Sequence, residues 1–491
     1  MSVQLSIAAH TNAGKTTLVR TLLKRDIGEV ADRPHVTENA ERHTLLDTAQ
    51  GDVLFLWDTP GFGDSARLLK RLQASGNPIG WLQTQVWDRF ADRPFFCSQQ
   101  AVRNVRDESD VVLYLVNAAE DPSAAAYVDA ELQILKWIGK PVLLLLNQAG
   151  PPRGREAEAA DEARWNRQLA LQVQDRGVIT LDAFARCWVQ EDRLLRAVAE
   201  LLDPVKKEQM ERLRGAWRER NLDIFRASMR SMANLLASVA VDREAVPEKL
   251  DAGALAQRAV QWLKRKREGG SGQEPGVENA MAALVKRLDE RVREDTDRLI
   301  ALHGLAGRAQ QRILARAAGQ FEVAMPADVA TTGLVGGALT GAATGIAADL
   351  STGGLTMGAG MLIGAILGAL GAGGAAKAYN ILQGQEDGRV RWTGDVLGQQ
   401  TRAALLRYLA VAHYGRGRGE WTEGEAPAHW WPLVDAVVSA REPILHAAWT
   451  MAEEGAAAPA IAARLEPELR DAASDLMVRL YPDASGLFPA P

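Results

Sequence analysis

Apolar and β-branched residues recur in short runs along the first ~200 residues, and most of the runs are separated by stretches with helical periodicity. The runs cover residues 3–8, 53–57, 111–116, 142–146 and 178–181. Short buried strands that alternate with helices are typical of a doubly wound, mostly parallel sheet. We therefore expect an α/β domain over residues 1–203, closed by a helix at 191–202 and bounded by Pro204.

Beyond Pro204 the pattern changes to helical spacing, and no convincing strand is predicted. Ala, Leu, Arg and Glu dominate, and a linker-like sequence at about 268–277 interrupts the run. We expect an all-α C-terminal part, with helical regions over 204–328 and 379–491. The α/β domain carries an insertion at about 64–109 with several aromatic residues, which is either an effector surface or an extra packed helix.

A glycine-rich apolar segment at 329–376 carries a single charge, Asp349, between two runs. Glycine stands at every fourth position in each run: Gly333, Gly337, Gly341 and Gly345, then Gly360, Gly364 and Gly368. This spacing predicts a glycine-zipper helical hairpin over 329–378, because small residues let two helix backbones approach closely. About 20 apolar residues can cross a bilayer, yet Ala, Gly and Thr are only weakly hydrophobic. Membrane insertion or docking, burial inside the helical domain and an oligomer interface all remain open.

Length and composition narrow the class of protein. At 491 residues the chain is expected to form two or three domains. A net charge of -5 gives no support for a general nucleic-acid binder, so no specific nucleic-acid partner is expected. Cys97 and Cys187 form neither metal-site spacing nor a disulfide framework. With no secretory signal recognised, we expect a cytoplasmic protein, with association at the inner membrane as an option that the hairpin leaves open.

A glycine-rich loop joins the first strand to the first helix, predicted at 16–24. In this setting backbone N–H groups, a helix N-terminus and a lysine surround the phosphates of a nucleotide. Lys15 is expected to reach the β- and γ-phosphates, and the Thr16 hydroxyl to bind Mg²⁺. Ala9 stands where such loops usually begin with glycine. The nucleotide-binding residues expected here are Asn12, Ala13, Gly14, Lys15, Thr16 and Thr17.

A second motif, Asp58-Thr59-Pro60-Gly61, follows the strand at 53–57. Because both strands are expected to end at the same edge of the sheet, the Asp58 carboxylate can hold a water of the Mg²⁺ shell. Gly61 would let the backbone approach the γ-phosphate. Between the motifs lies a polar loop in which Thr37 is the expected second Mg²⁺ ligand, although a threonine there can also be an ordinary turn residue.

The base should be read by Asn147, at the end of the strand at 142–146. Guanine selection normally needs an Asn-Lys-x-Asp arrangement, but Gln148 and Gly150 occupy the lysine and aspartate positions. Asn147 alone cannot distinguish guanine from adenine. Asp182, after the last strand, is a candidate substitute for the missing aspartate.

The residue after Gly61 is Phe62, where many GTPases carry a water-orienting glutamine, so hydrolysis by that route is excluded. Asn12 offers another route to hydrolysis, because its amide oxygen could hold a K⁺ ion whose charge stabilises the transition state. The alternative is that Asn12 only stabilises the turn of the loop. The expected catalytic residues are Lys15, Asn12 and Thr37.

These motifs resemble the Era, TrmE and EngA branch of bacterial GTPases. The resemblance rests on Asn12 in the phosphate loop, the Asp-Arg-Pro-x-x-Thr sequence ending at Thr37, the Asp58–Gly61 motif and Phe62. The sequence looks closer still to a proteobacterial group of Era-like GTPases whose helical C-terminal half is a domain of unknown function. The resemblance implies Mg²⁺-dependent GTP hydrolysis and strengthens the roles of Thr37 and of K⁺ at Asn12.

Together these observations predict an Era-like switch that binds GTP and GDP and couples nucleotide state to a helical domain with an unknown protein effector. One alternative is a membrane-interacting, dynamin-like assembly protein with slow turnover, in which residues 329–376 contact the membrane. Another is a GTPase of ribosome or RNA assembly, which rests on analogy with Era alone.

Overall fold

The structure is a computed structural model. It describes residues 2–24, 39–75, 80, 93–148, 155–169, 178–181, 187–245, 275–305, 389–392, 394–414 and 429–488. The chain forms two compact units. The first comprises Met1–Asp223, Ala412–Trp421 and Met477–Ala490, and the second comprises Ile224–Val411, Thr422–Leu476 and Pro491.

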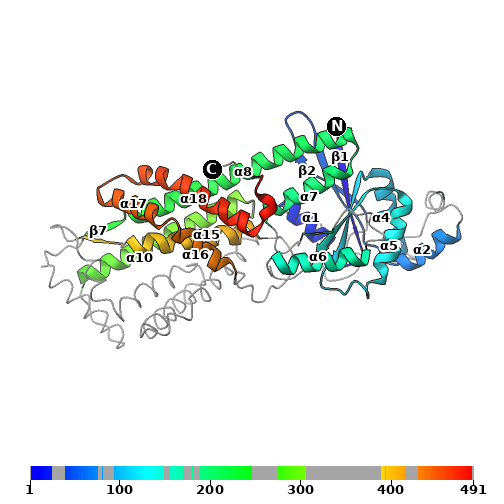
Figure 1. The fold of residues 1–491 in the computed structure, drawn as a ribbon, viewed down its shortest axis with the longest axis horizontal. Coiled ribbons are helices and arrows are strands. Elements are labelled where there is room, and N and C mark those ends of the chain that lie inside the picture. The colour runs from blue at the N-terminus through cyan, green and yellow to red at the C-terminus, as the bar shows by residue number, and fades with distance from the viewer. Residues whose placement is uncertain are drawn as a thin grey trace. The chain divides into compact units, whose positions relative to one another are not determined.

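The first unit contains the sheet whose strands β1 and β2 are labelled in Figure 1. Its six strands follow the order β2-β3-β1-β4-β5-β6. Its parallel strands are β1 (Ser2–Ala9), β3 (Val53–Asp58), β4 (Val111–Asn117), β5 (Val142–Asn147) and β6 (Val178–Thr180). All of them lie where the hydrophobic runs predicted strands, so the doubly wound α/β fold is confirmed. The sequence did not predict β2 (Glu41–Asp47), which pairs antiparallel with β3 at the edge of the sheet.

Helices connect these strands and cover the sheet. They are α1 (Lys15–Leu23), α2 (Ser65–Ala74), α4 (Arg93–Glu108), α5 (Ala126–Ile138), α6 (Arg155–Leu169) and α7 (Trp188–Leu201). Strands β1 and β4 pair in the middle of the sheet. Nearly every side chain of both strands is buried, so these two strands form the centre of the apolar core. The expected insertion contributes α2 and α4, and the N-cap of α2 is Asp64, whose side chain accepts a hydrogen bond from Arg67 N. Cys97 and Cys187 are buried, unbridged thiols.

The rest of the described chain is mainly helical, as predicted. Its helices are α8 (Pro204–Ala240), α10 (Pro275–Leu302), α15 (Gly394–Ala412), α16 (Trp430–Ser439), α17 (Glu442–Glu453) and α18 (Ala458–Leu480), followed by the short 3₁₀ helix η2 (Pro482–Ala484). The expectation of no strand beyond Pro204 was wrong, because β7 (Arg243–Ala245) pairs antiparallel with β8 (Arg389–Arg391). Three residues are too few to show a two-residue period, so the pattern gave no signal.

The predicted glycine-zipper hairpin at 329–378 lies outside the described residues, as does most of the predicted linker. Within the described ranges, no helix combines the length and the apolar character needed to cross a membrane. The predicted domain boundaries stay predictions.

Candidate nucleotide-binding site

The phosphate loop connects the end of β1 to the start of α1, and its backbone conformation depends on two residues. Asn12 has a φ of 66° and Gly14 a φ of 87°, both in the left-handed region that asparagine and glycine tolerate best. A Cβ atom on Gly14 would lie 2.5 Å from the Asn147 side-chain nitrogen. Glycine is therefore required at this position for two reasons, its φ and the close approach of Asn147.

Lys15 is buried at the start of α1, with 7% of its surface exposed. Its ammonium group donates hydrogen bonds to the carbonyl oxygens of His10, at 3.0 Å, and Ala9, at 3.4 Å. Burial lowers the pKa of Lys15 from 10.5 to about 8, although the nearby Asp58 and Glu131 carboxylates act in the opposite direction. A buried ammonium whose hydrogen bonds in the described ranges go to neutral carbonyl groups is suited to receive an anion.

Asp58, at the end of β3, is the second buried charge of the site. One of its oxygens, Oδ2, accepts a hydrogen bond of 2.7 Å from the Thr16 hydroxyl. The other, Oδ1, is buried and has no hydrogen-bond partner among the described residues. Burial raises the pKa of Asp58 from 3.8 to about 6, against the opposing effects of the Thr16 hydrogen bond and the Lys15 charge. A hydroxyl beside a carboxylate with an unused oxygen fits the ligand chemistry of Mg²⁺.

Two amide side chains at the end of β5 hold the phosphate loop from its other side. Asn147 Nδ2 donates to Ala13 O at 2.8 Å, and Gln148 Nε2 donates to Asn12 O at 3.2 Å. The sequence assigned Asn147 only to the base, so its contact with the loop is an additional role. The contact of Gln148 was not predicted, because nothing local in the sequence relates residues 136 positions apart.

The segment after Asp58 packs directly against the phosphate loop. A Cβ atom on Gly61 would lie 2.8 Å from Lys15 Nζ and 3.0 Å from Thr11 Cα, so only glycine allows this approach. Phe62 N donates to Ala9 O at 3.0 Å, and Thr11 N donates to Phe62 O at 3.1 Å. The Phe62 side chain is fully buried in the core, which leaves it no access to a hydrolytic water.

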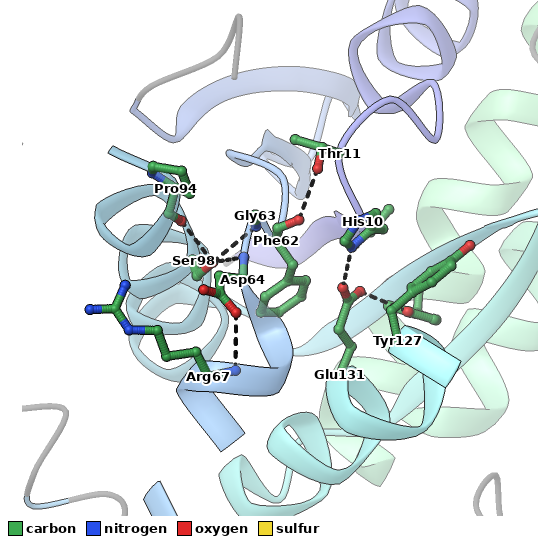
Figure 2. Close-up of polar contacts among 12 residues, drawn as sticks. His10, Thr11, Phe62, Gly63, Asp64, Arg67, Pro94, Ser98, Tyr127 and Glu131 are labelled. Carbon is green, nitrogen blue, oxygen red and sulfur yellow. Dashed lines mark hydrogen bonds and ion pairs between the residues drawn. The ribbon is translucent and has the colours of Figure 1, made fainter. Parts of the chain in front are cut away.

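Helix α4 holds the residues that follow Phe62 (Figure 2). The Ser98 hydroxyl accepts a hydrogen bond of 3.0 Å from Gly63 N and donates one of 2.9 Å to Pro94 O. The insertion identified in the sequence therefore contacts the segment after Gly61 through a serine that no motif singled out.

Most of the predicted site residues meet at the carboxyl-terminal ends of β1, β3 and β5, as a parallel sheet with these loops dictates. Contacts within this group join the loop residues Ala13–Thr16 to Asp58, Gly61 and Asn147, and Asn12 contacts Gln148. Thr17 is buried in the first turn of α1. Thr37, Gly150 and Asp182 lie outside the described residues, so their predicted roles stay predictions. In the described ranges no group of three or more His, Cys, Asp or Glu side chains could hold a metal ion.

The fold and this site define a domain of the P-loop GTPase class, and residues 4–148 match the family described as 50S ribosome-binding GTPase. Residues 168–478, more than half of the chain, match the family described as domain of unknown function DUF3482. The chain belongs to that family. The resemblance to Era-like GTPases with a C-terminal domain of unknown function is thus confirmed.

The chain is also similar to individual GTPases. GTPase Era of Heliobacterium modesticaldum is 26% identical over 144 residues, which cover 29% of this chain and 38% of that protein. GTPase Der of Myxococcus xanthus is 29% identical over 164 residues, which cover 33% of this chain and 29% of that protein. The chain therefore spans less than half the length of these relatives.

A solved structure of Era in complex with MgGDPNP and part of 16S ribosomal RNA is 15% identical to this chain. The match covers 41% of this chain and 57% of that one, with a TM-score of 0.30, which is too low to carry an argument. The ribosomal RNA is a component of that Era complex.

Proposed function

We propose that this chain is an Era-like GTPase that binds Mg-GTP and hydrolyses it to GDP and phosphate. The observation that carries the proposal is the convergence of two buried charges at one edge of the sheet. The Lys15 ammonium donates hydrogen bonds to two neutral carbonyl groups, and within the described part of the chain Asp58 Oδ1 is buried without a hydrogen-bond partner. Burying such groups is costly unless a ligand of complementary charge completes their interactions.

In this proposal each residue has a separate task. The Lys15 ammonium neutralises charge on the β- and γ-phosphates, and the close approach of Gly61 brings its backbone to the γ-phosphate. The Thr16 hydroxyl, with Asp58 acting through a water, and Thr37 would hold Mg²⁺. When bound, the metal neutralises the charge that develops on the phosphate oxygens. The carbonyl contacts of Lys15 would be exchanged for phosphate contacts.

The hydrolytic step is proposed to use K⁺ at Asn12, because Phe62 is buried and cannot orient water. Asn12 is exposed on the loop, and Gln148 holds its backbone carbonyl. Turnover in KCl should exceed turnover in NaCl for the parent, and Asn12→Ala should remove the difference. Equal rates of the parent in both salts would eliminate the cation site while leaving nucleotide hydrolysis intact.

The choice of GTP over ATP rests on similarity to the GTPase family, since Gly150 replaces the usual base-reading aspartate. Isothermal titration with slowly hydrolysed analogues of GTP and ATP tests it directly. Tighter binding of the GTP analogue is expected. Equal affinity, or a preference for the ATP analogue, would overturn the base assignment without affecting the triphosphate site.

Helix α8 is our candidate for coupling nucleotide state to the helical region. Arg212 binds Asp52, in the turn between β2 and β3, through hydrogen bonds of 2.7 and 3.3 Å. Asn221 accepts a hydrogen bond of 3.5 Å from Lys24, just after α1. Residues 24 and 52 lie before and after the predicted switch loop that carries Thr37, so α8 contacts the chain on both sides of that loop. The helix then continues to Ala240.

Hydrogen–deuterium exchange of residues 224–240 with GDP and with a GTP analogue would test this coupling. A nucleotide-dependent difference is expected in the parent and should shrink in Arg212→Gln. Arg214→Gln is the matched control, because Arg214 lies on the same helix but binds Asp192 of α7, at 2.7 Å. Equal differences in both variants would exclude this route.

A second candidate function is a membrane-interacting, dynamin-like assembly protein with slow turnover, acting in the cytoplasm and at the inner membrane. The glycine spacing at 329–376 favours it. Liposome flotation with and without nucleotide separates the two candidates. If the protein does not float and Gly341→Leu only lowers its stability, the membrane proposal fails.

A further inference from the structure

A fully buried carboxylate lies behind the phosphate loop, outside every nucleotide-binding motif. Glu131 of α5 has no exposed surface, and its Oε1 atom lies 2.7 Å from His10 Nδ1 in the loop (Figure 2). Its other oxygen, Oε2, accepts a hydrogen bond of 2.8 Å from the Tyr114 hydroxyl in β4. Both oxygens are therefore used, one by the core of the sheet and one by the loop.

The His10 ring is fixed on a second side by an aromatic contact. Its centroid lies 4.4 Å from that of Tyr127, which is also on α5. The Tyr127 hydroxyl in turn donates to Glu120 at 2.7 Å, so the tyrosine, whose ring is tilted by 32° to that of His10, is itself held in place. A histidine with one ring nitrogen bound to a carboxylate and one face covered has little rotational freedom.

Fixing the His10 side chain also fixes its backbone. The His10 carbonyl is the closer of the two that accept hydrogen bonds from Lys15, and His10 forms the bridge to Phe62 that joins the loop to the segment after Asp58. Movement of His10 would displace both the carbonyl group that Lys15 contacts and the bridge to Phe62. Contact with Glu131 therefore acts on the backbone that positions the phosphate-binding ammonium and the segment that reaches the γ-phosphate.

Packing of the folded core alone does not explain why a carboxylate, Glu131, is buried at this position. Transferring a carboxylate from water to the interior is costly, and a neutral side chain of similar size could accept the Tyr114 hydrogen bond. Burial raises the pKa of Glu131, while the contact with His10 lowers it, and the charge of Glu131 helps to keep Lys15 protonated. Of the groups that favour its charged form, His10 and Lys15 belong to the phosphate loop and Tyr114 belongs to β4.

We propose that Glu131 is a positioning residue for the phosphate-binding loop and acts through the His10 side chain. The inference rests on the proposed function, because it assigns a role in nucleotide binding at that same site. It makes α5 part of the binding machinery, although α5 carries none of the motif residues.

The test measures the affinity for a Mg-bound GTP analogue in Glu131→Gln, His10→Ala and the double variant. Each single variant should bind about tenfold more weakly, as is common when a group that orients a ligand-binding side chain is removed. The double variant should lose less than a further twofold, because both changes remove the same contact. His10 is partly exposed, so His10→Ala keeps the test informative if Glu131→Gln does not fold.

Glu191→Gln is the matched control. Glu191 is also a buried glutamate of the first unit, and it accepts a hydrogen bond of 2.9 Å from the Trp217 ring nitrogen. Its variant should lose stability but bind nucleotide within twofold of the parent. If His10→Ala or Glu131→Gln also stays within twofold of the parent, or if their losses are additive, the positioning role is wrong. Failure of the parent itself to bind nucleotide would instead overturn the proposed function.

Discussion

The first unit buries Lys15 and Asp58, and the second buries Arg407 and Asp295, yet the two sets of charges are arranged differently. In the second unit the charges pair with each other: Arg407 and Asp295 are 2% and 3% exposed, with Nη2 and Oδ2 3.5 Å apart. Ser231 adds a hydrogen bond of 2.7 Å to the other Asp295 oxygen. Burial lowers the pKa of Arg407 and raises that of Asp295, and their mutual attraction opposes both changes.

In the first unit Lys15 and Asp58 do not form an ion pair among the described residues. Lys15 is held by carbonyl groups and Asp58 by a hydroxyl, and Asp58 Oδ1 has no hydrogen-bond partner in the part of the chain that the structure describes. The difference teaches that the buried charges of the second unit compensate each other as an ion pair, whereas the buried charges beside the phosphate loop are held apart and favour a ligand. Mutation of the Arg407–Asp295 pair should therefore mainly lower stability, whereas mutation of Lys15 or Asp58 should mainly lower the affinity for nucleotide.

The largest effect on stability is expected from Arg407→Met. This change leaves Asp295 buried without its partner and should lower the free energy of unfolding by about 3–5 kcal/mol. Adding Asp295→Leu should restore most of the loss, since no uncompensated charge remains. Urea unfolding measures both effects. A double variant as unstable as the single one would show that the charges do more than satisfy each other.

Lys15→Met should have the reverse effect, with a small change in stability and a large loss of nucleotide affinity. It removes a charge whose pKa burial has lowered to about 8, so the free energy of unfolding should change by no more than about 1 kcal/mol. Affinity for a GTP analogue should fall about 100-fold, equivalent to about 2.7 kcal/mol. Titration calorimetry beside urea unfolding gives both quantities. A large loss of stability with unchanged affinity would reverse the assignment of the two charge sites.

The pKa shifts predict a pH range for binding. Below pH 6 Asp58 becomes protonated and loses its charge for Mg²⁺, so the affinity for the Mg-bound GTP analogue should fall with falling pH. Above pH 8 Lys15 is neutral in the free protein, so affinity should also fall as pH rises, by at most about tenfold per pH unit. At pH 8 binding should take up protons, measured by calorimetry in buffers of different ionisation enthalpy. Lys15→Met should lack the fall above pH 8, and its persistence there would disprove the assignment to Lys15.

The smallest effect is expected at Gln148. Gln148→Gly removes the hydrogen bond to Asn12 O but permits the φ of 58° found at this residue. The loss of one partly exposed hydrogen bond should cost about 1 kcal/mol, or roughly fivefold in affinity for the GTP analogue. Unchanged affinity would mean that Asn12 keeps its conformation without this contact.

The sequence was sufficient for the parallel strands and the phosphate loop, because buried strands and glycine-rich motifs have strong local signals. It was insufficient for β2, whose sequence Glu-Arg-His-Thr-Leu-Leu-Asp is largely polar at an exposed sheet edge. The contacts of Glu131 with His10 and of Gln148 with Asn12 join residues 121 and 136 positions apart. Such pairs depend on strand order, which no local pattern encodes.

The central claim is that the site around Lys15 and Asp58 cleaves a nucleoside triphosphate. Phosphate release from GTP, measured with Mg²⁺ in KCl for the parent and for Lys15→Met, tests it most directly. The account predicts steady release by the parent and none above background by the variant. No release by a folded parent, or equal release by both proteins, would contradict it.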